Sequence, residues 1–302
     1  MKTNQRLSIA ILVVMFLLSG MAALSAAKGQ TLMAVSQQSA EPKILVEMVK
    51  QLIEAHTDLK VEHKQHFQGV SIVHAAFMSR DVDFYVSHTG SQFTGVLHME
   101  VTDAWRNREK VLDYVQAEFQ NQFNATWFEP FGFNNTYALV MRKDAIEALG
   151  IETMEDLAEH APDLVVGMDQ VFMGRIGDGY YDMADYYDLK FKQTVSMDYD
   201  LMYRAVDAGD VDVAVAYSTD GRIASLDLGI LQDNKQFFPP YDGSLIVHND
   251  VLKEFPVIRD VVEPLLGRID EAEMAALNSK VDVEHLEPED VAREYLEKEG
   301  LL

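Results

Sequence analysis

Cysteine is absent from all 302 residues of this chain. Without thiols the protein has no disulfide, no thiolate zinc site, no cysteine nucleophile and no cysteine that a lipid could modify as an anchor. Basic residues are scarce as well: 25 Lys and Arg stand against 49 Asp and Glu, and the formal net charge is −24. A chain this acidic repels nucleic-acid phosphates and anionic lipid head groups, so we expect neither as a partner.

Motifs that carry chemistry are also missing. The run Gly174–Gly179 has neither the spacing nor the lysine of a phosphate-binding loop, and no Gly-x-Ser-x-Gly elbow occurs. The nine histidines form no His-Glu-x-x-His, and we expect His56 and His63 at the surface. The run Ser218–Asp220 places hydroxyls beside a carboxylate, but no base accompanies it. The sequence therefore predicts no catalytic residue, no metal and no cofactor.

A single long apolar run stands at the N-terminus. Lys2 and Arg6 precede apolar residues from Leu7 to Leu18, and Ser25-Ala26-Ala27 supplies small residues for cleavage. This layout is typical of a secretory signal over residues 1–27, because a membrane span needs about 20 apolar residues. Its removal deletes two basic and no acidic groups, which takes the net charge from −24 to −26. We expect an exported protein, in the periplasm or at the outer face of the cytoplasmic membrane; an uncleaved anchor is the alternative.

Helical and strand-like patterns alternate along the rest of the chain. Strands are predicted at residues 31–35, 59–63, 82–86, 137–141, 164–167 and 211–216. Helices are predicted at residues 43–56, 70–78, 144–149, 154–159 (with Thr153 as N-cap), 202–208 and 288–299. Strands separated by helices indicate parallel sheets covered by helices, and the chain length favours two α/β units.

The segments that join these two units are aromatic where linkers are normally polar. They read FGFNNT at residues 131–136 and FFPPYD at residues 237–242. Because ligand clefts concentrate at domain interfaces, two aromatic crossings indicate a cleft between lobes. Tyr114, Tyr137, Tyr217 and Tyr241 lie near polar loops and are candidate ligand contacts. Each can equally be a tyrosine with its ring in the core and its hydroxyl in solvent.

Several motifs follow one another in order along the chain. They are GFNNTYAL at residues 132–139, AYSTDGRI at 216–223 and FFPPY at 237–241, with shorter matches at 43–45, 88–90, 178–179, 274 and 277–278. Together they resemble the glycine betaine/carnitine/choline-binding proteins of osmoprotectant ABC importers, from about Thr31 to the C-terminus. The resemblance implies a two-lobed α/β periplasmic-binding-protein fold of type II, with two crossovers and a ligand cleft between the lobes. Residues 30–136 plus 242–302 would form lobe 1 and residues 137–241 lobe 2, and the lobes would close on the ligand.

The resemblance also implies how a ligand is held. A quaternary ammonium donates no N–H hydrogen bond, whereas each aromatic ring face attracts it by about 0.5–2 kcal/mol. Three or four rings can therefore supply micromolar binding, about −8 kcal/mol, without a buried counter-carboxylate. Tyr137, Tyr217 and Tyr241 fall on positions that look like cage walls, and Tyr114 is a weaker match. The polar positions carried over to the ligand site are Gln38, Thr89, Gln92, Arg175 and Thr219.

Two positions depart from the family pattern. His88 stands where relatives commonly have a tyrosine before Thr-Gly. Neutral imidazole still presents a ring face, but imidazolium repels a cation, so we expect weaker trimethylammonium binding below about pH 6. Residues 171–174 also lack a glutamate that some relatives carry before the arginine. Arg175 is therefore expected either to pair with a ligand carboxylate, as in betaine or carnitine, or to stabilise the closed lobes.

These observations predict a monomeric, exported solute-binding protein that delivers a quaternary ammonium osmolyte to the permease subunits of an ABC transporter. Three alternatives stay open. The same fold could bind another small cation or zwitterion, because His88 alters one wall. The scaffold could carry an enzyme, or it could serve as a sensory binding module whose partner is a receptor.

Overall fold

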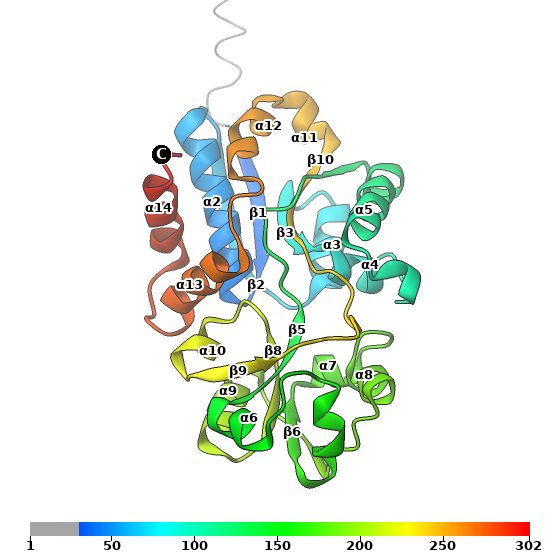
Figure 1. Ribbon diagram of the computed structural model, residues 1–302. Coiled ribbons are helices and arrows are strands. Elements are labelled where there is room, and N and C mark those ends of the chain that lie inside the picture. The colour runs from blue at the N-terminus through cyan, green and yellow to red at the C-terminus, as the bar shows by residue number, and fades with distance from the viewer. Residues whose placement is uncertain (1–29) are drawn as a thin grey trace, which may run out of the picture.

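The computed structural model describes residues 30–302, and two five-stranded sheets organise this part of the chain (Figure 1). The first sheet contains β1 (Thr31–Gln37), β2 (Lys60–Phe67), β3 (Phe84–His88), β4 (Ala125–Trp127) and β10 (Gly243–His248). The second contains β5 (Tyr137–Arg142), β6 (Val165–Met168), β7 (Gln193–Ser196), β8 (Val213–Tyr217) and β9 (Leu228–Leu231). We call the part built on the first sheet lobe 1 and the part built on the second lobe 2. The predicted signal, residues 1–27, lies outside the described residues.

The two sheets share one topology. Their strand orders are β2-β1-β3-β10-β4 and β7-β6-β8-β5-β9. In each sheet the first three strands are parallel, and the fourth is antiparallel to both of its neighbours. That fourth strand is the first one after the chain has crossed between the lobes, β5 in one case and β10 in the other. The predicted parallel arrangement is therefore right for three strands of each sheet, and the crossings add an antiparallel strand.

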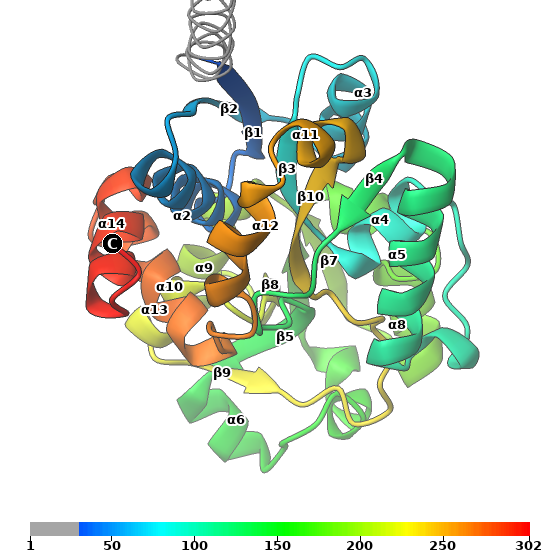
Figure 2. The same ribbon diagram turned by 90° about the horizontal axis from the view of Figure 1, so that it is seen from above.

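Helices cover both faces of the sheet in lobe 1 (Figure 2). One face carries α2 (Ala40–His56), α12 (Val257–Val262), α13 (Glu271–Asp282) and α14 (Pro288–Lys298), and the other carries α3 (Val70–Met78), α4 (Thr89–Gly95) and α5 (Arg108–Phe123). Side chains alternate along each strand, so Leu245 and Val247 of β10 pack on the α2 side and Ile246 packs on the α5 side. The remaining helices are η1 (Asp103–Trp105), α11 (Asn249–Glu254) and η4 (Glu263–Leu265).

Lobe 2 has the same layered construction. On one face of its sheet lie α6 (Lys143–Leu149), α7 (Gln170–Gly174) and α8 (Tyr180–Tyr187), and on the other lie α9 (Tyr199–Ala208) and α10 (Gly221–Ser225). Tyr137, Leu139 and Met141 of β5 face the α7–α8 side, whereas Val140 faces α9. The alternation therefore decides that Tyr137 and the aromatic residues of α7 and α8 share one side of the sheet.

One predicted helix of lobe 2 is wrong. Residues 154–159 form no α-helix; they contain the short 3₁₀ helix η2 (Asp156–Glu159), and a second one, η3 (Ala161–Asp163), follows. The hydroxyl of Thr153 does accept a hydrogen bond from the Asp156 amide at 3.1 Å, as a cap would. However, Thr153 also forms a β-bridge with Gln232, and the Met154 amide donates to the Gln232 carbonyl at 2.9 Å. This pairing holds the chain extended where the helix would begin.

The two crossings run side by side between the lobes (Figure 1). Asn134 of the first crossing forms an antiparallel bridge with Asp242 of the second. The Asn135 amide donates to the Tyr241 carbonyl at 3.0 Å, and the Tyr241 amide donates to Asn134 Oδ1 at 2.6 Å. The segments that the sequence singled out as unusual linkers are thus joined to one another.

The lobes also meet where α13 of lobe 1 packs against α10 of lobe 2. A Cβ atom on Gly221 would overlap the backbone of Ser279, so glycine permits the close approach of these two helices. Within residues 30–302, no helix has both the length and the apolar character needed to cross a membrane.

Candidate functional site

Three tyrosines from separate segments meet beside the crossings. Tyr137 opens β5, Tyr217 ends β8, and Tyr241 belongs to the second crossing. The register of β5 and β8 pairs Tyr137 directly with Tyr217, which places both side chains on one face of the sheet. Their ring centroids are 5.0 Å apart, and the Tyr241 ring lies 5.8 Å from that of Tyr137, edge-on at 88°. The structure thus brings together three of the four tyrosines that the sequence singled out.

These rings are neutral and largely shielded from solvent. Burial raises the pKa of Tyr137, and it raises the pKa values of Tyr217 and Tyr241 well above that of an ordinary phenol. Phe172 and Phe238 extend the aromatic surface, with centroids 4.6 Å and 5.7 Å from that of Tyr137. A group of uncharged rings presents negative quadrupole potential from several faces, which suits a cation that cannot donate a hydrogen bond.

A guanidinium group occupies one face of this cluster. Arg175 Cζ lies 5.6 Å from the centroid of the Tyr137 ring. Its Nε donates to Asp178 Oδ1 at 2.8 Å, and its Nη2 donates to Asp178 Oδ2 and, at 2.9 Å, to Thr94 Oγ1 of lobe 1. The hydroxyl of Tyr241 donates to Asp178 as well. Arg175 therefore links lobe 2 to lobe 1 at the aromatic cluster, with its charge balanced by a carboxylate that is only 1% exposed.

The start of α4 supports the second crossing from lobe 1. The hydroxyl of Thr89 donates to the Pro240 carbonyl at 2.8 Å and accepts from the Asp242 amide at 2.9 Å. Gly90 lies so near Tyr241 that a Cβ would stand 2.7 Å from its ring. The side chain of Gln92 is fully buried, and its Nε2 donates to Ser87 Oγ at 2.9 Å. In this geometry Thr89 holds the segment that carries Tyr241.

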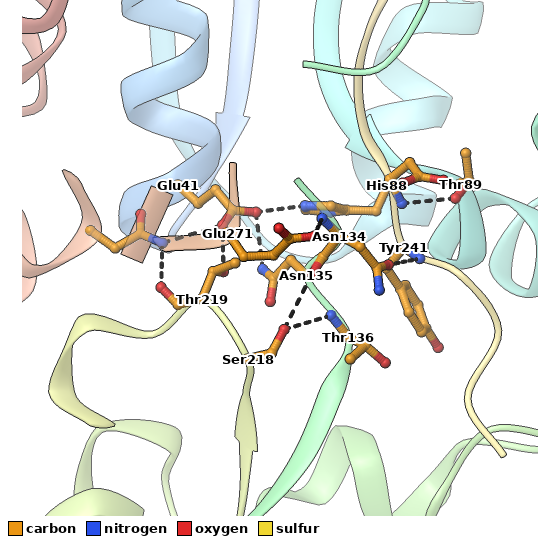
Figure 3. Close-up of polar contacts among 12 residues, drawn as sticks. Glu41, His88, Thr89, Asn134, Asn135, Thr136, Ser218, Thr219, Tyr241 and Glu271 are labelled. Carbon is orange, nitrogen blue, oxygen red and sulfur yellow. Dashed lines mark hydrogen bonds and ion pairs between the residues drawn. The ribbon is translucent and has the colours of Figure 1, made fainter. Parts of the chain in front are cut away.

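A buried carboxylate that the sequence did not single out lies between the lobes (Figure 3). Glu41, in the first turn of α2, is 3% exposed. Its Oε1 lies 2.6 Å from His88 Nε2 and accepts from Asn135 Nδ2 at 2.9 Å. Its Oε2 accepts from Thr219 Oγ1 at 2.7 Å and from Asn278 Nδ2 at 3.2 Å. Burial alone raises the pKa of Glu41, but the hydrogen bonds from His88, Thr219 and Asn135 outweigh burial and hold it below the ordinary value.

Comparison with known proteins decides the family. Residues 30–298 match the family model of the substrate-binding domain of ABC-type glycine betaine transport systems. This chain belongs to that family. It is 37% identical over 259 residues to a carnitine transport binding protein of Listeria monocytogenes, covering 85% of this chain and 83% of that protein. It is 31% identical over 297 residues to a glycine-betaine-binding protein of Pseudomonas aeruginosa, covering 94% and 93%.

A solved structure is similar over nearly its whole length. The crystal structure of a glycine betaine/carnitine/choline ABC transporter protein superimposes with a TM-score of 0.81 at 34% identity, covering 89% of this chain and 99% of that one. The predicted periplasmic-binding-protein architecture, with two lobes and two crossovers, is therefore confirmed. The family is one of transporter substrate-binding domains and not of enzymes.

The other residues predicted for the site lie in different surroundings. Gln38 is exposed on the turn between β1 and α2 and takes no part in the contacts described here. Tyr114 packs in lobe 1 against Phe93 and Trp105, with ring centroids 5.7 Å and 4.9 Å away. The ring of His88 does not join the three tyrosines among the described contacts, because its Nε2 is directed to Glu41.

His63, expected at the surface, is half-buried, and its side chain is only 2% exposed. The sequence pattern misled because β2 alternates, and His63 falls on the side that α2 covers. His63 Nδ1 lies 2.6 Å from Glu47 Oε1, and its Nε2 lies 2.8 Å from Ser36 Oγ. This connectivity is that of a Ser–His–Glu triad, but Ser36 is 1% exposed, so a substrate cannot reach it in this conformation.

The described residues 30–302 contain no group of three or more His, Asp or Glu side chains placed to hold a metal ion. Of the residues that the sequence missed, Asn134, Asn135 and Asp178 stand inside motifs that were recognised, so their neighbourhood was signalled. No feature of the sequence around Glu41 indicated a role in the site. An acidic residue in the first turn of a helix is common, because it complements the helix dipole, and nothing local shows that the carboxylate is buried.

Proposed function

We propose that this protein is the extracytoplasmic solute-binding component of an ABC importer and captures a quaternary ammonium compatible solute, namely glycine betaine, choline or carnitine. The observation that carries the proposal is the meeting of Tyr137, Tyr217 and Tyr241 at the crossings between the lobes. Neutral rings attract a methylated cation through their faces and need no proton donor on it. Membership of the transporter family and the names of the relatives support the same ligand class.

We assign the trimethylammonium group to the faces of the three tyrosines. A ligand carboxylate, as in betaine or carnitine, would be held by Arg175, whose guanidinium stands over Tyr137. Arginine suits this role because its guanidinium has five N–H donors, and the pairing with Asp178 and Thr94 through Nε and Nη2 leaves those of Nη1 for the ligand. Choline has no carboxylate and would rely on the rings alone.

We also propose the lobe boundaries, with residues 30–136 and 242–302 in lobe 1 and residues 137–241 in lobe 2. The division is supported by the strands of the two sheets and by the bridge between Asn134 and Asp242 at both boundaries. Closure of the lobes on the ligand would present a defined surface to the membrane-embedded permease. The protein would act as an exported monomer and would not bind nucleic acid.

A thermal-shift panel tests the function. Glycine betaine, choline, carnitine and proline betaine should each be compared with a neutral isostere, 3,3-dimethyl-1-butanol, which has the shape of choline without its charge. A ligand at a hundred times its Kd stabilises the folded protein by about 2.7 kcal/mol, which is readily detected. If no quaternary ammonium raises the Tm, or if the neutral isostere raises it equally, the proposed function is wrong. A shift with another small cation or zwitterion alone would favour the alternative ligand.

A further inference from the structure

Two buried glutamates of α2, six residues apart, each pair with a histidine of a neighbouring strand, His88 of β3 and His63 of β2. Glu41 Oε1 is 2.6 Å from His88 Nε2, and Glu47 Oε1 is 2.6 Å from His63 Nδ1. Both glutamates are 3% exposed. Their remaining partners differ, because Glu47 pairs with Lys50 of its own helix at 3.0 Å. Glu41 instead reaches beyond lobe 1.

The additional partners of Glu41 belong to the segments that carry the tyrosines. Thr219, which donates to Glu41 Oε2, stands two residues after Tyr217 at the end of β8. Asn135, which donates to Glu41 Oε1, stands two residues before Tyr137 at the start of β5.

Asn135 also forms a hydrogen bond with the third tyrosine, Tyr241. The backbone N–H of Asn135 donates to the Tyr241 carbonyl at 3.0 Å, so Glu41 is connected through Asn135 to the second crossing. Through the side chains of Asn135 and Thr219, one carboxylate is therefore connected to the segments that carry all three tyrosines; Figure 3 shows Glu41 with both of these partners.

We propose that Glu41 is the positioning residue of the ligand site, holding both crossings and β8 in the arrangement that assembles the tyrosines, and that His88 is its hydrogen-bonding partner in lobe 1. The inference rests on the proposed function for its ligand and on geometry for its mechanism. Asn278 adds a second tie, because its Nδ2 donates to Glu41 Oε2 and, at 2.9 Å, to the Thr219 carbonyl. Both lobes are thus tied to one buried charge.

Other charged groups hold the same crossings. Arg108 Nε lies 2.5 Å from Oδ1 of Asp242, a buried carboxyl of the second crossing. Burial raises the pKa of Asp242, and Arg108 opposes that rise. Glu271, on α13, accepts a hydrogen bond from the Asn134 amide of the first crossing at 3.1 Å.

The tie requires an ionised Glu41, because its carboxylate oxygens accept the hydrogen bonds that form it. Burial raises the pKa of Glu41, but the hydrogen bonds from His88, Thr219 and Asn135 outweigh burial and hold the pKa below its ordinary value of 4.5. The contribution of Glu41 is therefore present above about pH 4.5 and is lost as the pH falls through the lowered pKa. Affinity should fall in the same range.

The test is calorimetric titration of the full chain with glycine betaine, using Glu41→Gln and the matched control Glu47→Gln. A glutamine at position 41 replaces one acceptor oxygen by an N–H₂ group, which opposes either the donor of Asn135 or those of Thr219 and Asn278. We expect about tenfold or greater loss of affinity for Glu41→Gln and less than about threefold for Glu47→Gln, although both lower the Tm. Equal losses in both glutamate variants, or wild-type affinity in Glu41→Gln, would overturn the proposal.

A second readout does not depend on the ligand. Because the chain has no cysteine, Glu109→Cys in lobe 1 and Asp185→Cys in lobe 2 provide two unique exposed sites for spin labels. Glu41→Gln should broaden the distance distribution between the labels, and Glu47→Gln should leave it unchanged. If wild-type protein binds no quaternary ammonium but these distributions differ as expected, the function fails and the positioning role stands. Identical distributions in the two variants would refute the positioning role.

Discussion

Replacement of Tyr217 by leucine removes one aromatic face while keeping an apolar side chain at the end of β8. The ring of Tyr217 lies 5.0 Å from that of Tyr137 and 5.3 Å from that of Tyr199. Tyr217 is only partly buried, in contrast to Tyr137 and Tyr241, so leucine disturbs the core of lobe 2 less here than at either neighbour. A substitution at position 217 therefore measures the contribution of a ring to binding with the least disturbance of the fold.

The expected magnitude follows from the two kinds of contact that the ring makes. Loss of two aromatic pairs costs about 0.5–1.5 kcal/mol each in stability, which lowers the Tm by several degrees without unfolding the protein. Loss of one cation–π contact costs about 1–2 kcal/mol in binding, which raises the Kd for glycine betaine about 5- to 30-fold. Tyr217→Phe keeps the ring and loses only the hydroxyl, so its Kd should stay within about threefold of wild type.

The assay is isothermal titration of both variants with choline and with 3,3-dimethyl-1-butanol. The charged and neutral ligands have the same shape, so the difference in their binding free energies isolates the attraction of the cation to the rings. Tyr217→Leu should reduce that difference, and Tyr217→Phe should preserve it. If leucine weakens both ligands equally, the ring acts through apolar contact alone, and the cation–π argument is refuted.

Three further outcomes are expected. Gly90→Ala should weaken betaine binding in calorimetry, because its Cβ would stand 2.7 Å from the Tyr241 ring, whereas Gly174→Ala, with no atom within 4 Å, should not. Arg175→Lys keeps the charge but cannot pair with Asp178 through a fork and also donate to a ligand carboxylate, so the Kd should rise about fivefold or more for betaine and carnitine and change less for choline. Burial, and to a smaller extent the nearby His248, lowers the pKa of His74 from 6.5 to about 4. Because folding favours the neutral imidazole, the free energy of unfolding should fall by at most about 3 kcal/mol as the pH drops from about 6.5 to 4. Urea titrations at each pH should show no such fall for His74→Phe, and an unchanged fall in that variant would contradict the assignment to His74.

Local pattern predicted most of the elements in both lobes. The helix predicted at residues 70–78 is α3 with the same bounds, and that predicted at 288–299 ends one residue earlier as α14. Apolar spacing succeeds there because a helix buries a single stripe, which the sequence displays directly. The helix predicted at 154–159 failed because Thr153 pairs with Gln232, a contact across nearly eighty residues that local spacing does not contain.

In the candidate site, too, the sequence predicted some residues correctly and missed contacts between distant segments. Tyr137, Tyr217 and Tyr241 were recognised because they stand in motifs shared with a family, and their rings meet in the structure. His88 was recognised too, but its partner was not, since the orientation of a ring depends on the helix that packs against it. Tyr114 illustrates the converse, because it was only a weaker match to the family positions and the fold packs it against Trp105.

By itself the sequence determined the absence of thiol chemistry, the two α/β units, the aromatic crossings and the family. Each of these follows from the composition or from motifs of consecutive residues. Only the tertiary structure decided that Glu41 joins the lobes and that His88 faces a carboxylate and not the rings. The reason is physical: the burial of a charge and the direction of a hydrogen bond depend on residues far apart in the chain, and folding alone brings them within reach.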